Sequence, residues 1–156
     1  RDETPDAPIA GMKSKGIDYD PTFSVVEGLS NFAKGNVEGL KGSLVQQVTP
    51  KDLLTGTEHA ASSPEMKKMR DGLAHYPLSL EIGSRNLLKA WRAGVMLVRV
   101  TDAGNPLVLH VPTVQPEIEL WVTAGVPADL PLQVAAWNAA KLLPSTQRPS
   151  SLGQGP

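Results

Sequence analysis

Glycine and proline recur along this chain so often that they limit how far any regular element can run. The 156 residues include 14 glycines and 14 prolines, which together approach a fifth of the sequence. Proline fixes φ and has no backbone N–H, whereas glycine adopts turn conformations that other residues avoid. We therefore expect many turns and irregular chain ends.

The length and the charge of the chain exclude several classes of protein. A chain of 156 residues suits one domain and is too short for two ordinary ones. It has 15 basic and 16 acidic residues, and the only basic cluster is Lys67, Lys68 and Arg70. Nucleic-acid binding depends on a positive field that releases counterions. The sequence therefore carries no strong nucleic-acid signal.

The absence of cysteine excludes a second group of sites and structures. Without it the chain has no disulfide, no thiolate zinc site, no iron–sulfur cluster and no cysteine nucleophile. The apolar runs are far shorter than a membrane span, so we predict no transmembrane segment and a soluble chain. The sequence has no basic segment followed by an apolar one, so we predict no signal peptide. Because the sequence begins at Arg1, we expect a fragment or a chain released by proteolysis.

Changes in composition divide the sequence into three predicted regions. Residues 1–22 show no sustained period and are predicted to form an extended arm. Residues 23–143 contain the periodic segments and are predicted to form a single mixed α/β domain. Residues 144–156 are rich in proline, serine and glycine, which indicates a polar C-terminal tail.

The clearest helical spacing lies in residues 25–48, where apolar residues recur every three or four positions. Four glycines interrupt it, each costing about 1 kcal/mol relative to alanine. The segment therefore needs a partner surface to be helical, and otherwise it splits into a short helix and a coil. Gly28, Gly35 and Gly42 share one heptad position and would allow close backbone approach. The segment is either a loosely packed core helix or an amphipathic segment that docks on a partner chain or a membrane surface. Its predicted interaction residues are Leu29, Val37, Leu40 and Leu44.

Three later segments carry further helix signals. Ser63 begins one helix as its N-cap, with Gly72 or Pro77 as its end, and Ser84 caps a short helix over residues 85–92. Residues 129–143 are apolar around most of a helix circumference, which predicts burial in this chain or against a partner. Trp137 lies in that segment and is a predicted interaction residue.

Short alternating segments over residues 78–123 predict an antiparallel β meander with flanking helices, and therefore an α+β fold. Asp102 to Asn105 supplies turn chemistry between two of its strands. In the last strand Trp121 would point away from the apolar face, so we predict it to be an exposed interaction residue. The predicted strands are 78–82, 95–101, 107–111 and 117–123.

A search for catalytic and ligand-binding motifs finds none. The three histidines lack the spacing of metal ligands, and the sequence contains no Gly-x-Ser-x-Gly, phosphate loop or Gly-x-Gly-x-x-Gly. Glu117 and Glu119 share one face of a predicted strand, but simple alternation with apolar residues explains them better. We therefore predict no catalytic residue, no cofactor and no metal site.

Residues 94–125, GVMLVRVTDAGNPLVLHVPTVQPEIELWVTAG, resemble the closing strands of jelly-roll capsid proteins of picorna-like viruses. In that family a strand of the type G-x-x-x-V-R-V leads through a proline-rich loop to a last strand of the type V-x-I-x-V-W-V-x-A-G. Residues 94–100 and 118–125 stand in those places. The resemblance implies a capsid component and a location in the virion.

These observations predict a structural or assembly protein whose apolar helix and arms are completed by partner subunits in a homo- or hetero-assembly. The missing catalytic motifs and the apolar segment 131–143 both favour this class. The alternative is a small peptide- or ligand-binding module that uses an exposed sheet edge. An enzyme with a scattered site is the third hypothesis.

Overall fold

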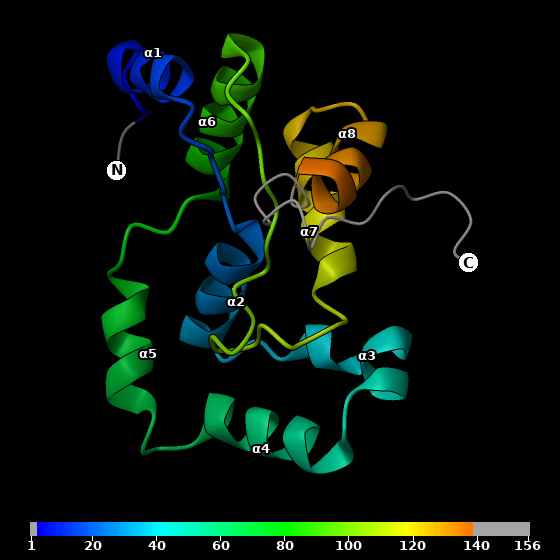
Figure 1. Cartoon of the computed structure of the whole chain (residues 1–156). Coiled ribbons are helices and arrows are strands. Elements are labelled where there is room, and N and C mark those ends of the chain that lie inside the picture. Colours follow the sequence, from blue (N-terminus) through cyan, green and yellow to red (C-terminus); the bar gives the residue numbers. More distant parts are fainter. Residues whose placement is uncertain (1–2, 139–156) are drawn as a thin grey trace, which may run out of the picture. The chain divides into compact units, whose positions relative to one another are not determined.

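The computed structural model describes residues 3–138, and most of that range is helical (Figure 1). A 3₁₀ turn at Glu38–Lys41 lies between α2 and α3, and a π-helical turn at Val134–Asn138 follows α8. The α-helices are α1 (Asp6–Lys15), α2 (Phe23–Ala33), α3 (Ser43–Val48), α4 (Lys51–Ser62), α5 (Lys67–Ala74), α6 (Leu80–Ala93), α7 (Val114–Ala124) and α8 (Asp129–Gln133).

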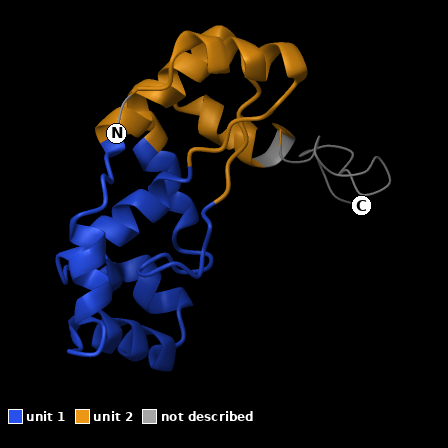
Figure 2. Cartoon of the chain, turned by 90° about the vertical axis from the view of Figure 1, so that its left-hand side faces the viewer, with its two compact units in different colours: residues 1, 22–80, 101–120 blue, residues 2–21, 81–100, 121–156 orange. Residues whose placement is uncertain are grey.

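The described residues form two compact units, which Figure 2 distinguishes by colour. The first unit comprises residues 22–80 and 101–120, and it contains α2 to α5 and most of α7. The second unit comprises residues 3–21, 81–100 and 121–138, and it contains α1, most of α6 and α8.

The predicted β meander is wrong, because residues 3–138 contain no sheet. Of residues 78–82, the last three begin α6, and residues 117–123 lie inside α7. Tyr19 and Leu97 form one isolated bridge. The predicted extended N-terminal arm is likewise corrected, since it contains α1.

Two physical features prevent residues 95–111 from forming strands. Pro106 and Pro112 cannot donate to a ladder. Asp102, Leu107 and Val111 have φ values of 48°, 61° and 70°, which interrupt an extended backbone. Several apolar side chains of this segment are instead buried without a ladder, namely Val95, Leu97, Val98, Val108 and Leu109.

In the first unit, Gly28 allows residues 106–108 to lie directly against α2. A Cβ atom at Gly28 would lie 2.7 Å from Val108 Cγ2 and 2.8 Å from the carbonyl oxygen of Pro106. Gly35 instead ends α2 with a φ of 65° and has no such close neighbour. The predicted close approach is therefore confirmed at Gly28. Residues 25–48 do not form one continuous helix, because they are divided among α2, a 3₁₀ turn and α3.

This contact predicts opposite effects for two glycine-to-alanine substitutions. Gly28→Ala should lower the free energy of unfolding by roughly 1–3 kcal/mol, because the added methyl group overpacks against Val108. Gly72→Ala in α5 should raise it by about 0.5–1 kcal/mol, because no atom lies within 4 Å of the added methyl group. Urea unfolding followed by helical circular dichroism measures both. Equal stability of the two variants would contradict the close approach.

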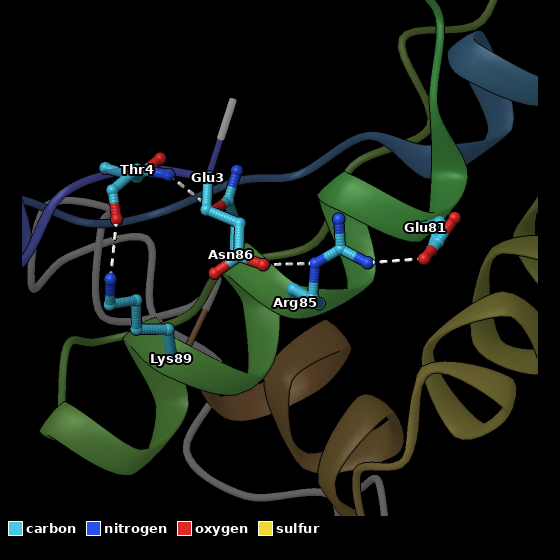
Figure 3. Close-up of polar contacts among 6 residues, drawn as sticks. All are labelled: Glu3, Thr4, Glu81, Arg85, Asn86 and Lys89. Carbon is cyan, nitrogen blue, oxygen red and sulfur yellow. Dashed lines mark hydrogen bonds and ion pairs between the residues drawn. The ribbon is translucent and has the colours of Figure 1, made fainter. Parts of the chain in front are cut away.

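The second unit joins the N-terminal residues to α6 through polar contacts (Figure 3). The N–H of Thr4 donates to Asn86 Oδ1 at 2.8 Å, and Lys89 Nζ donates to the Thr4 carbonyl at 2.8 Å. Arg85 forms ion pairs with Glu3 and, one turn earlier on α6, with Glu81. These ion pairs are largely exposed, so each contributes little to stability. The two hydrogen bonds to Thr4 fix the chain just before α1.

Candidate functional site

The first unit contains a buried carboxylate that caps α2. Glu117 of α7 accepts hydrogen bonds from the N–H groups of Phe23, at 2.9 Å, and Ser24, at 2.5 Å, and a third bond from the Ser24 hydroxyl. Thr22, the residue before α2, has a φ of 42° and provides no side-chain cap. Glu117 therefore satisfies two of the orphan donors at this helix start, and the positive end of the helix dipole stabilises its charge.

A second carboxylate, Glu27, lies one turn further along α2 and is half-buried. Burial raises the pKa of Glu27 above its usual value of 4.5, and the negative charges of Glu117 and Glu119 raise it further. The ionised form of Glu27 is therefore disfavoured at this position. Either a proton or a neighbouring cation offsets that cost.

Glu27 faces a cavity of about 110 Å³ inside the first unit. Helix α2 contributes the polar residues Ser24, Glu27 and Asn31 to its wall, while the 3₁₀ turn, α3 and residues 107–116 contribute mainly apolar ones. Apart from two prolines, the apolar lining residues belong to the cluster of Leu40, Leu54 and Leu109 or pack against it. The apolar lining residues are Val37, Leu40, Val45, Leu107, Leu109, Pro112 and Pro116.

A larger groove, of about 600 Å³, lies between α4 and residues 104–110. Helix α4 contributes Leu53, Gly56 and Ala60, which lie three and four positions apart and therefore share one face. Leu53 is 44% exposed although it is large and apolar. The other lining residues are Phe32, Asp52, Thr57, Met66 and residues 104–110.

The residues predicted to mediate interactions are distributed unevenly over the structure. Leu44 on α3 is 40% exposed, whereas Leu40 is buried and Leu29 and Val37 are partly buried. Trp121 is 0% exposed, because its position on α7 is helical and not the outer face of a strand. The side chain of Trp137 lies outside the described part of the chain. Val37 and Leu40 line the small cavity, and none of the five residues with a described side chain lines the groove.

Two features of this site were not predicted from the sequence: the position of Glu27 in the cavity wall and the capping role of Glu117. A signal for Glu27 was present, because Ser24, Glu27 and Asn31 lie three and four positions apart and form a polar stripe on a predicted helix. Glu117 had no such signal, since the helix that it caps begins more than 90 residues earlier in the chain.

Three further findings concern metal binding, membrane spanning and similarity to known proteins. Within residues 3–138, His, Cys, Asp and Glu side chains nowhere gather in threes that would hold a metal ion. No helix in that range has the length and apolar character needed to cross a membrane. Comparison of the chain with protein-family models, with curated proteins and with solved structures finds no match.

Proposed function

We propose that this chain is an assembly protein whose α4 groove is completed by a second copy of the chain. The observation that carries the proposal is the exposed Leu53 beside a groove of about 600 Å³. Leu44 and Val48 of α3 add exposed apolar surface to the same unit.

The apolar residues of α4 that line the groove are self-complementary. They are one large residue, Leu53, and two small ones, Gly56 and Ala60, and they lie beside the polar Asp52 and Thr57. A twofold contact between two copies uses the same patch twice, so a protruding side chain must meet a recess on that same patch. Two antiparallel α4 helices place Leu53 of each copy against Gly56 and Ala60 of the other. This matching supports a second copy as the occupant.

The proposal does not depend on the resemblance to capsid proteins. The role in a virion stays a prediction of the sequence, and residues 3–138 lack the strands that the resemblance implies. The alternative of peptide binding at a sheet edge has no basis in those residues, because they form no sheet.

Size-exclusion chromatography with light scattering tests the assembly. We expect the wild-type chain to show twice the 16.6 kDa mass of a single copy, or a higher multiple. Leu53→Asp should give the single-copy mass, because a carboxylate buried against Gly56 and Ala60 has no partner there. A wild-type chain that remains single at every concentration would refute the proposal.

Thr55→Asp is the matched control for this test. Thr55 is exposed on α4 and does not line the groove. Its replacement by aspartate adds the same negative charge to α4 as Leu53→Asp does. It should therefore keep the wild-type mass. Dissociation of both variants would show that added charge on α4, and not the groove, controls assembly.

A further inference from the structure

The small cavity beside α2 has one charged lining residue, Glu27. Lysine, arginine and histidine are absent from its lining. The nearby Glu117 is occupied by its bonds to Phe23 and Ser24. The cavity therefore presents a single carboxylate together with the neutral polar groups of Ser24, Asn31, Asn36 and Thr113.

The carboxylate of Glu27 is available for a ligand. Among residues 3–138 it makes no hydrogen bond and no ion pair. The charges of Glu117 and Glu119 act on it unfavourably, so a cation placed in the cavity would be attracted by all three carboxylates. A metal ion needs more ligands than one carboxylate supplies, and the described residues offer no such group. An organic cation fits this environment better.

The rest of the lining selects a short hydrocarbon chain. Val37, Leu40, Val45 and Leu109 surround the cavity with apolar side chains. Its volume of about 110 Å³ is smaller than an engineered apolar cavity of roughly 150 Å³ that holds benzene. A ligand of about five non-hydrogen atoms is therefore the size that this cavity accepts.

We propose that this cavity binds a primary alkylammonium group, with the cation against Glu27 and the hydrocarbon among Val37, Leu40 and the other apolar residues of the lining. A free alkylamine and a lysine side chain of another protein share this chemistry. The site goes beyond the assembly function and is independent of it, because Leu53, Gly56 and Ala60 do not line the cavity.

Calorimetric titration of the whole chain with butylammonium tests the proposal. Butylammonium should bind at least tenfold more tightly than butan-1-ol, which has the same hydrocarbon chain without the charge. Equal binding of the two would overturn the proposal, as would no binding of butylammonium. This comparison uses the wild-type protein, so it does not depend on the folding of a variant.

A blocked lysine, acetylated at its α-amino group and amidated at its carboxyl group, distinguishes the two sources of the cation. If the blocked lysine binds as tightly as butylammonium, the site accepts a lysine side chain of another protein. If only butylammonium binds, the ligand is a free amine. Both results support an ammonium site. If neither compound binds, the proposal is overturned.

Substitution of the carboxylate locates the cation. Glu27→Gln should weaken butylammonium binding tenfold or more, because the amide keeps the shape but not the charge. Glu58→Gln removes the same charge from an exposed position on α4 outside the cavity, and it should leave the affinity unchanged. Unchanged affinity in a folded Glu27→Gln variant would overturn the assignment of Glu27.

Discussion

The Glu117→Gln variant is expected to lose about 3 kcal/mol of unfolding free energy. The wild-type carboxylate accepts bonds from the Phe23 N–H, the Ser24 N–H and the Ser24 hydroxyl, and it is completely buried. Glutamine has only one oxygen, so its NH₂ group must face at least one of these donors. A buried donor left without an acceptor loses its bond to water and finds no replacement.

Urea unfolding measures this loss, and Glu119→Gln is the matched control. Glu119 is exposed two positions further along α7 and accepts a bond from Gln115 at 2.9 Å. Its substitution should change the unfolding free energy by less than about 0.5 kcal/mol. If the two variants were equally stable, the carboxylate of Glu117 would not be the cap of α2.

The same substitution should also affect the cavity. Ser24 belongs both to the α2 start that Glu117 caps and to the cavity wall. A loosened first turn of α2 moves Ser24 and displaces Glu27, one turn later, from the lining. Glu117 is therefore a positioning residue for the proposed cation site, although it does not itself line the cavity.

The sequence allowed parts of this fold to be predicted where local signals were sufficient. Ser63 was predicted to be the N-cap of the helix that follows it. Its hydroxyl accepts a bond from the Met66 N–H at 3.3 Å, but α5 begins only at Lys67, with Met66 in the N-cap position. The helical period near residue 25 correctly placed α2. Gly28 was correctly identified as a point of close approach. The period and the glycine spacing lie within residues a few positions apart, which a single sequence displays directly, whereas the partner of Gly28 in residues 106–108 was not predicted.

The strands were predicted wrongly because short apolar runs fit two periods. In residues 117–123, Ile118, Leu120 and Val122 alternate as in a strand. The structure instead buries Glu117 and Trp121, four positions apart on one face of a helix. Since one of these residues is a carboxylate, an apolar pattern could not identify that face. Its burial becomes favourable only when the start of α2 supplies three donors.

The groove and the cavity depend on contacts between distant parts of the sequence. Residues 104–110 lie against α2 and α4, and they have no element of their own that a period could reveal. Leu107 reaches this position with a φ of 61°, which residue type alone does not indicate. Leu53, Gly56 and Ala60 of α4 are separated in the sequence by residues such as Thr55, Glu58 and His59. Their common face appears only when the helix is formed.

Trp121→Ala should cost roughly 3–5 kcal/mol of unfolding free energy, the largest effect expected for a single substitution in the second unit. The side chain of Trp121 is 0% exposed, so its removal leaves a cavity and removes its packing contacts. The carbonyl oxygen of Trp121 also accepts the N–H of Val126, where Gly125 ends α7 with a φ of 105°. Because natural domains have only about 5–15 kcal/mol of stability, this variant should be close to unfolding.

Val122→Ala, at the next position on α7, is the control for this prediction. Val122→Ala removes two methyl groups from a side chain that is 39% exposed. It should therefore lower the free energy of unfolding by less than about 1 kcal/mol. Thermal unfolding followed by tryptophan fluorescence and by circular dichroism compares the two variants. A strand with Trp121 on its outer face predicts the reverse order, with Val122 in the core. Greater destabilisation by Val122→Ala would therefore restore the strand interpretation of this segment and refute α7.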